Sequence, residues 1–293
     1  MQKIYIEISD ICGLNCSFCD TQKARRGVMD LELFKKATLE ARKHTKLIAL
    51  HILGDPLCVE NLGDYLAIAK EANLGVEITT SGIYLSDFDL LLNPPIKQVN
   101  FSLDAIIELK NEESFLRKIF DFCAFKKKSD IFVNLRVQKR ARNKPLVAIL
   151  EREFNIKNLV QNLFTPKQNR IKLGDKIIID FRGIFAWDSN KNDDFSVEKT
   201  RKSHKISSDS AKDSVVFGTC LALKNHIGIL SNGEIVPCCI DTQGRLSLGN
   251  IANSSIQSAL QGKRARKMRE SFSKNVVYEV FCKSCDYRKR FMK

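Results

Sequence analysis

The sequence predicts an α/β protein in which a partial (β/α)6, TIM-like barrel over residues 1–187 is followed by a small α+β domain over residues 215–293. A chain of 293 residues with 44% hydrophobic content can bury cores for one large and one smaller domain. Residues 3–137 alternate short β-branched apolar runs with longer segments at helical spacing, which is typical of parallel β/α units. Residues 188–214 are rich in Ser, Asn, Asp and Lys and lack apolar periodicity, which predicts a linker or long surface loop.

The same alternation gives each element an expected position. Short apolar runs predict six strands, at Ile4–Ile8, Leu47–Leu53, Val76–Thr80, Gln98–Leu103, Ile131–Val137 and Lys176–Phe181. Amphipathic segments between them predict helices at Leu31–Lys43, Leu62–Ala72, Ser86–Leu92, Glu112–Phe125 and Lys144–Phe154. Barrels of this kind carry their functional residues on the loops at the carboxyl ends of the strands. After the linker, the sequence predicts a hairpin around Ser231–Gly233, a turn near Gln243–Gly244 and a basic helix over Ser254–Ser271.

The formal net charge of +14 raises the question of nucleic-acid binding, because clustered Lys and Arg bind phosphates. Basic runs occur at Lys126–Lys128, Lys139–Arg142, Lys263–Lys267 and Arg288–Arg290. These runs are scattered, no nucleic-acid-binding module surrounds them, and few aromatic residues are placed to stack on bases. Solvated Lys-rich surface is therefore favoured over a nucleic-acid site.

The ten cysteines point to a metal. No stretch is long and apolar enough for a membrane helix, and the N-terminus lacks the layout of a signal peptide, so a cytoplasmic location without a membrane partner is expected. Cytoplasmic thiols stay reduced, which favours metal ligation over a disulfide framework. Two cysteines that stand alone, Cys58 and Cys123, are interpreted as small buried hydrophobes.

Three cysteines, Cys12, Cys16 and Cys19, directly follow the first predicted strand. Three thiolates on a tight loop can ligate three irons of a cubane and leave the fourth iron open. A closed cluster or a structural zinc usually takes four ligands. The alternative is a zinc site completed by a distant ligand such as His44 or His51.

The spacing C-x3-C-x2-C, with the aromatic residue Phe18 just before the third cysteine, resembles the signature of the radical S-adenosylmethionine (SAM) superfamily. The resemblance implies that Cys12, Cys16 and Cys19 hold a [4Fe–4S] cluster whose open iron is chelated by SAM. It also implies that an injected electron, from a flavodoxin- or ferredoxin-type donor, cleaves SAM to methionine and a 5′-deoxyadenosyl radical. Phe18 is then expected to lie against the adenine.

Other segments resemble family signatures in the same order along the barrel. Gly54-Asp55-Pro56 resembles the Gly-Gly-Glu type motif that offers backbone to the SAM amino group, although Leu53 replaces the first glycine and Asp55 the glutamate. The resemblance implies SAM contacts at strand ends, from Gly54, Asp55, Thr80, Ser81, Ser102, Asp104, Asn134 and Arg136. A Ser or Asp at a strand end is also commonly a helix cap, so that alternative stays open.

The C-terminal third contains four spaced cysteines, at Cys220, Cys238, Cys282 and Cys285. They can converge on one tetrahedral metal or one cubane, and their spacing does not choose between zinc and iron–sulfur. The order C…G-x4-C…C-x2-C resembles the SPASM extension of radical SAM enzymes and its shortened relative, the twitch domain. Since no cysteine follows Cys285, the resemblance implies one auxiliary [4Fe–4S] cluster. Cys239 is then a spare thiol, with inert packing favoured over the alternative that it replaces its neighbour Cys238 as a ligand.

Four thiolate ligands would leave no open iron for a substrate, which favours an electron-transfer role for this second cluster. The resemblance to twitch-type enzymes favours a two-electron oxidation. The leading hypothesis is therefore a radical SAM oxidoreductase or maturase acting on a small molecule or a peptide, with no catalytic side chain named. Two alternatives remain. One is a radical SAM enzyme that modifies RNA, which the positive net charge suggests. The other is a non-catalytic scaffold in which bound zinc or iron–sulfur clusters only stabilise the fold.

Overall fold

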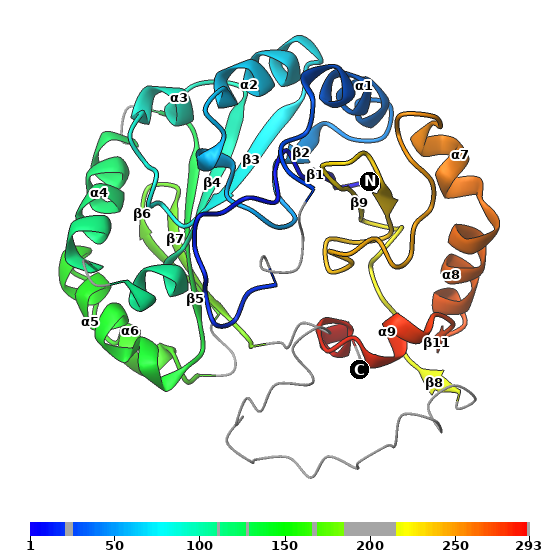
Figure 1. The fold of residues 1–293 in the computed structure, drawn as a ribbon. Coiled ribbons are helices and arrows are strands. Elements are labelled where there is room, and N and C mark those ends of the chain that lie inside the picture. The colour runs from blue at the N-terminus through cyan, green and yellow to red at the C-terminus, as the bar shows by residue number, and fades with distance from the viewer. Residues whose placement is uncertain (21–25, 110–111, 127–128, 166–168, 185–214, 292–293) are drawn as a thin grey trace.

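The computed structural model describes residues 1–20, 26–109, 112–126, 129–165, 169–184 and 215–291. Its main feature is one nine-stranded sheet with the strand order β10-β9-β1-β2-β3-β4-β5-β7-β6. Figure 1 shows helices around the outside of this curved sheet. The predicted linker at 188–214 lies outside the described residues.

The predicted α/β barrel fold is confirmed. Its parallel strands are β1 (Lys3–Ile6), β2 (Leu47–Ala49), β3 (Gly75–Thr80), β4 (Ile96–Ser102), β5 (Phe132–Gln138) and β7 (Ile177–Arg182). The outer helices are α1 (Leu31–Ala41), α2 (Leu62–Glu71), α3 (Phe88–Leu92), α4 (Glu112–Phe125), α5 (Lys144–Glu153) and α6 (Leu159–Asn162). Helix α1 begins where the Asp30 side chain accepts the backbone N–H groups of Glu32 and Leu33.

The C-terminal hairpin extends the barrel sheet. Strand β9 (His226–Ile229) pairs in parallel with β1, and β10 (Ile235–Val236) pairs with β9. This pairing joins segments more than two hundred residues apart, so nothing local in the sequence predicts it. A second unpredicted strand, β6 (Arg170–Gly174), runs antiparallel to β7 at the other edge of the sheet.

The remaining C-terminal elements lie on the same side of the molecule as the hairpin (Figure 1). They are β8 (Val216–Phe217), α7 (Ile256–Gln261), α8 (Lys263–Ser273), β11 (Val276–Val277) and α9 (Val280–Ser284). The prediction of one basic helix over Ser254–Ser271 is wrong, because the extended backbone of Gly262 divides the segment into α7 and α8. Two residues of basic runs interpreted as surface, Lys126 and Arg288, are in fact buried.

Side chains on the barrel strands alternate between two environments. One set, including Ile4, Ile48, Ile78 and Val99, is fully buried in the apolar core. The opposite, inner face is mostly polar, unlike the branched apolar filling that is usual in such barrels. Its residues include Lys3, Tyr5, Glu7, His51, Glu77, Thr79, Gln98, Asn100, Asn134, Arg136, Asp180 and Arg182. Polar side chains in a barrel interior indicate a polar binding space.

Within the described part of the chain, no helix is long and apolar enough to cross a membrane.

Candidate iron–sulfur and SAM sites

The three N-terminal cysteines lie on a tight loop after β1. The Cys19 N–H donates to the Cys16 carbonyl over 3.1 Å, which closes a turn between two thiols. Burial raises the pKa of the Cys12 thiol to about 12, and the nearby charges of Asp55 and the Cys19 thiolate add to the rise. Thiolates crowded in this way need positive charge, which iron supplies. The donor set therefore fits a cluster with three protein ligands.

The loop after β2 rests on this cysteine loop through its backbone. The Asp55 N–H donates to the Ile11 carbonyl over 2.9 Å. Gly54 has a φ of +67°, and a Cβ atom there would lie 2.2 Å from the Ser9 carbonyl oxygen. Only glycine allows this approach. The predicted SAM-binding loop and the cysteine loop are thus held together by Gly54.

Three predicted SAM contacts bind one another. The buried Asp55 carboxylate accepts from Thr80 Oγ1 at 2.9 Å, Ser81 N at 2.8 Å and Ser81 Oγ at 2.7 Å. These hydrogen bonds fix the loops after β2 and β3 to each other and occupy the side chains. A direct role of these residues toward SAM remains a prediction.

Ser102 is the last residue of β4, and Asp104 lies in the helical turn that follows it. The Asp104 carboxylate accepts from the Gln138 N–H at 3.0 Å and from Asn143 Nδ2 at 2.7 Å. Burial raises the pKa of Asp104, and these hydrogen bonds oppose the rise. Asp104 thus joins the helical turn after β4 to the end of β5 and to the Asn143 side chain before α5, and neither of these two bonds is a helix cap. Ser102 is half-buried and makes no capping bond to the helical turn that follows it.

Asn134 and Arg136 lie on the inner face of β5. Arg136 Nη1 donates to Thr79 Oγ1 at 3.0 Å and its Nη2 to Glu77 Oε1 at 3.2 Å. Burial and the neighbouring Arg182 lower the pKa of Arg136 to about 10. Asn134 Nδ2 donates to the Asn100 side chain at 3.2 Å.

Phe18 is covered by two arginines from the loop after β5. The guanidinium carbons of Arg140 and Arg142 lie 5.8 Å and 5.7 Å from the centre of its ring. Contacts of this kind are cation–π interactions. The structure thus gives Phe18 two cationic neighbours, and its contact with adenine remains a prediction.

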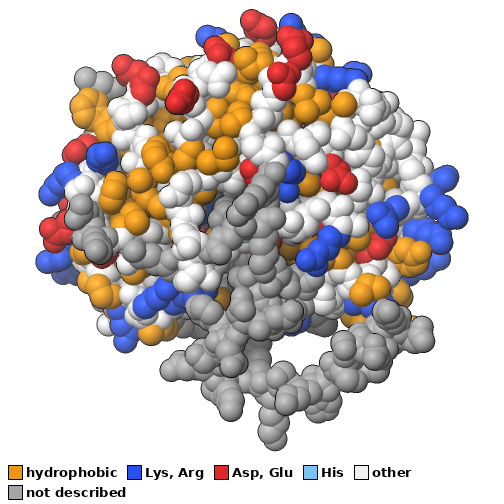
Figure 2. Space-filling view, in the orientation of Figure 1, with side chains coloured by type: hydrophobic (Ala, Val, Ile, Leu, Met, Phe, Trp, Pro, Cys, Tyr) orange, Lys and Arg blue, Asp and Glu red, His pale blue; other side chains and the backbone are white. Residues whose placement is uncertain are grey.

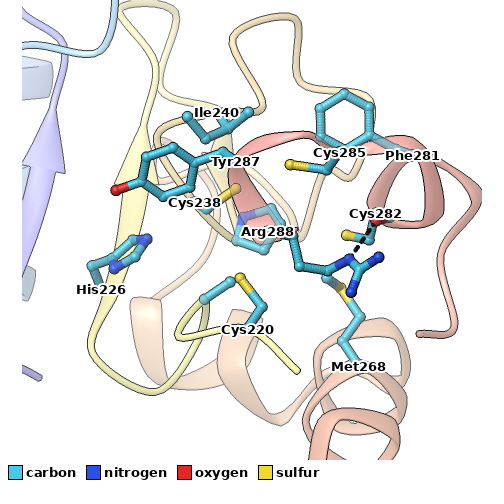
Figure 3. Close-up of a pocket in the computed structure, with 12 residues that line it drawn as sticks. Cys220, His226, Cys238, Ile240, Met268, Phe281, Cys282, Cys285, Tyr287 and Arg288 are labelled. Carbon is cyan, nitrogen blue, oxygen red and sulfur yellow. Dashed lines mark hydrogen bonds between the residues drawn. The ribbon is translucent and has the colours of Figure 1, made fainter. Parts of the chain in front are cut away.

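The four C-terminal cysteines line one pocket (Figure 3). Cys220 follows β8, Cys238 follows β10, Cys282 lies in α9, and Cys285 follows α9 directly. Burial raises the pKa of the Cys220, Cys238 and Cys282 thiols, and mutual repulsion of the thiolates adds to the rise. Segments 65 residues apart in sequence therefore converge as the spacing predicted.

This pocket suits a cubane better than one ion. Within the described part of the chain, no three His, Cys, Asp or Glu side chains are arranged to hold a single metal ion. The four thiols instead surround a cavity whose other walls are largely apolar. A [4Fe–4S] cubane requires four thiolates placed around a cavity, whereas a single metal ion requires ligands that converge on one position. Cys239 does not line the cavity, and its sulfur is hydrogen-bonded by the Tyr5 hydroxyl.

Sequence reasoning missed a buried charge network that connects the barrel to the C-terminal hairpin and to the loop after it. Glu7 is fully buried, and its Oε1 accepts from Arg26 Nη2 at 2.6 Å and from the Ser231 N–H at 3.1 Å. Its Oε2 accepts from the Leu53 N–H at 2.9 Å. Arg26 Nη1 donates onward to the Thr242 carbonyl at 2.9 Å. The acidic residue inside the apolar run Ile4–Ile8 was the available signal.

Comparison with known proteins agrees with this arrangement. The radical SAM superfamily matches this chain over residues 6–120, and an iron-sulfur cluster-binding domain, SPASM, matches it over residues 220–286. The chain therefore contains a radical SAM domain and a C-terminal SPASM-type iron–sulfur cluster-binding domain. These two domains imply a [4Fe–4S] cluster that binds SAM and at least one further cluster.

Particular relatives are distant. A tungsten-containing aldehyde ferredoxin oxidoreductase cofactor-modifying protein of Pyrococcus furiosus is 29% identical over 117 residues, which span 38% of this chain and 33% of that protein. The native anSMEcpe structure with bound AdoMet and the Kp18Cys peptide has a TM-score of 0.62 at 14% identity, covering 100% of this chain and 91% of that one. BtrN in complex with AdoMet and 2-DOIA has a TM-score of 0.52 at 15% identity, covering 97% and 92%. At such identity the two structures show a shared fold.

Proposed function

We propose that this protein is a radical SAM oxidoreductase or maturase that removes a hydrogen atom from a polar substrate held in the barrel interior. The observation that carries the proposal is that one sheet presents both cysteine groups: the three-cysteine loop follows β1, and β9, which pairs with β1, leads through β10 to Cys238. The bound N-terminal cluster would supply the electron that cleaves SAM. A cluster in the second pocket would supply an electron acceptor.

The inner face of the barrel supports a polar substrate. His51 Nδ1, Asn134 Oδ1 and Arg136 Nε are buried and have no hydrogen-bond partner among the described residues. A buried polar atom without a partner costs about 1–3 kcal/mol. A ligand that carries hydroxyl, amine, amide or carboxylate groups would satisfy them, whereas a hydrocarbon would not.

The structural neighbours support two kinds of polar substrate. BtrN was determined with 2-DOIA bound and anSMEcpe with a peptide bound. The Pyrococcus relative is named as a cofactor-modifying protein, which supports a maturation role. We therefore propose a small polar molecule or a peptide as the substrate, and a flavodoxin- or ferredoxin-type protein as the electron donor.

The proposed reaction is a two-electron oxidation. A substrate C–H bond breaks, and its hydrogen atom forms a new bond to the 5′ carbon of the deoxyadenosyl radical, which gives 5′-deoxyadenosine. A second cluster held by Cys220, Cys238, Cys282 and Cys285 would accept one electron from the substrate radical, and one proton would pass to a base or solvent. The product is therefore lighter by two hydrogens, and SAM is consumed.

The experiment starts with anaerobically reconstituted protein, SAM, reductant and fractionated cell extract, and identifies the fraction that raises 5′-deoxyadenosine. The substrate found there is then labelled with deuterium at the attacked carbon. We expect the label in 5′-deoxyadenosine and a product mass lower by two hydrogens. Return of the label to product with regeneration of SAM would instead show a redox-neutral rearrangement, and the oxidoreductase proposal would fail.

RNA modification receives no specific support from the structure. On the face in Figure 2, Lys and Arg side chains lie in several separate groups, at the rim and within the face, among acidic and apolar side chains. A tRNA site would need such a surface to neutralise several neighbouring phosphates.

A further inference from the structure

Arg288 occupies an unusual position for a residue in a basic run. It is 3% exposed, while Lys289 and Arg290 beside it are exposed. Arg288 lines the same pocket as the four C-terminal cysteines, and Figure 3 shows its guanidinium beside Cys282. Arginine is almost never buried unless a partner compensates its charge.

No described protein group provides that compensation fully. Arg288 Nε donates to the Cys282 carbonyl at 2.9 Å, which fixes the side chain at the end of α9. Its Nη1 is buried and has no hydrogen-bond partner among the described residues. Among the ion pairs found between described residues, none includes Arg288. A buried cation with a free N–H group therefore faces a cavity ringed by thiols.

We propose that Arg288 is the counter-charge and N–H donor of the auxiliary cluster, and that it raises the reduction potential of that cluster. A cubane with four thiolate ligands is an anion whose negative charge grows by one on reduction. A buried cation beside it therefore stabilises the reduced form more than the oxidised form, and an N–H donor to a cluster sulfur acts in the same direction. The inference rests on the proposed assignment of a cubane to the four cysteines.

A raised reduction potential of the auxiliary cluster matters for function, because the proposed oxidation needs an electron acceptor. A higher potential favours transfer of an electron from a substrate radical to the second cluster. Arg288 would thus act on the reaction only through the potential of the cluster. Because its guanidinium is buried, water does not screen its positive charge.

Arg288→Met, which keeps the length and loses the charge, should lower the reduction potential of the auxiliary cluster. We expect at least a tenfold fall in the equilibrium constant for reduction, which corresponds to about 59 mV for a one-electron couple. Arg288→Lys keeps the charge and should shift the potential by less than half as much. The matched control Lys289→Met removes an exposed charge that pairs with Asp286 on the surface, and it should leave the potential unchanged.

The measurement is a redox titration of reconstituted full-length protein with SAM, followed by electron paramagnetic resonance. SAM changes the signal of the cluster with the open iron, so the unaffected signal belongs to the auxiliary cluster. A second measurement needs no variant: with 15N-labelled arginine, pulsed resonance of the wild type should detect a nitrogen coupling to the reduced auxiliary cluster.

Two results would overturn the inference: a potential in Arg288→Met equal to that of the wild type, or absence of the nitrogen coupling. If the Arg288→Met variant binds no second cluster, its potential cannot be measured, and the nitrogen coupling in the wild-type protein tests the inference instead. Failure of the proposed function gives a different result. If the wild-type protein shows no signal from a second cluster, the four cysteines hold no cubane, and the proposed function fails together with the role of Arg288.

Discussion

At the scale of single residues, His51 shows how the polar barrel interior controls charge. Its ring packs edge-on against Tyr5, with ring centres 5.5 Å apart, and its Nδ1 has no partner among the residues described. Burial lowers the pKa of His51 to about 3, and the positive charge of Arg136 contributes to the fall. The folded protein therefore keeps this imidazole neutral.

The low pKa of His51 predicts a pH dependence of stability. The unfolded chain protonates His51 near the ordinary histidine pKa of 6.5, and the folded chain does so only near 3, so the unfolded state binds more protons between these values. Stability should thus be lost as the pH falls from 6.5 toward 3. From about pH 7 to about pH 5 the loss is about 2 kcal/mol. Denaturant unfolding of wild type and His51→Gln at both pH values measures it. An equal loss in the two proteins would contradict the assignment.

The grouping of the cysteines into two sets could be predicted from the sequence, whereas the hydrogen bonds of the polar residues could not. Ligand chemistry fixes cysteine spacing on a short loop, and Cys220 to Cys285 follow a similarly constrained order. The direction of a strand-end side chain depends on which loop packs beside it. Asp55 could be predicted to lie near the site, but its three bonds to Thr80 and Ser81 depend on tertiary contact between the loops after β2 and β3.

At the scale of elements, the two loops after β1 and β2 form one unit. Gly54→Ala would place a methyl group against the Ser9 carbonyl and force a positive φ on alanine. We expect destabilisation of about 2–3 kcal/mol and a fall in 5′-deoxyadenosine formation on the order of tenfold, because the predicted SAM-binding backbone moves. Thermal unfolding and single-turnover SAM cleavage measure both effects.

Gly63→Ala is the matched control for Gly54→Ala. Gly63 lies in α2, where an added Cβ would meet nothing closer than Leu90 Cδ1 at 4.0 Å. Alanine should stabilise this helix by up to about 1 kcal/mol and leave SAM cleavage unchanged. If Gly54→Ala behaves like Gly63→Ala, close contact of the two loops is not required for the reaction.

Element positions could be predicted where the pattern is local. The parallel strands and the helices α1 to α5 follow from the alternation of apolar runs, with errors of a few residues at their ends. The pairing of β9 with β1 could not be predicted, because a sheet edge accepts any strand with compatible faces. The division of α7 from α8 at Gly262 was predictable in principle, since glycine interrupts helices.

At the scale of the whole molecule, Glu7 connects the barrel to the C-terminal hairpin. Its carboxylate holds Arg26, the loop after β2 through Leu53, and the hairpin through Ser231. Glu7→Ala removes the 2.6 Å ion pair of the partly buried Arg26 and leaves only its 4.0 Å contact with Asp10, and we expect a loss of about 3 kcal/mol of unfolding free energy. Denaturant unfolding measures it. Glu270→Ala, which breaks the exposed pair between Glu270 in α8 and Lys274 just after this helix, should not change stability measurably. Equal stability of the two variants would show that Glu7 does not join the domains.

The two cysteine groups should divide the chemistry between them. Fully reconstituted protein should hold about eight irons and eight sulfides, as two cubanes require, and the triple alanine variant of Cys12, Cys16 and Cys19 should keep about half. Zinc as the native metal, or one cluster's worth of iron in the wild type, would exclude two clusters.

Reductive cleavage of SAM should depend on the N-terminal group alone, because SAM must chelate an iron with a vacant position. Cys16 and Cys282 are each 8% exposed, so their replacement by alanine is comparable in burial. Cys16→Ala should abolish 5′-deoxyadenosine formation, whereas Cys282→Ala should keep some cleavage that is no longer coupled to product. Cys123→Ala, in α4 and outside both groups, should retain both clusters and full cleavage. Equal loss in Cys16→Ala and Cys282→Ala, with folding verified by circular dichroism, would show that the second cluster is needed before SAM is cleaved and not after.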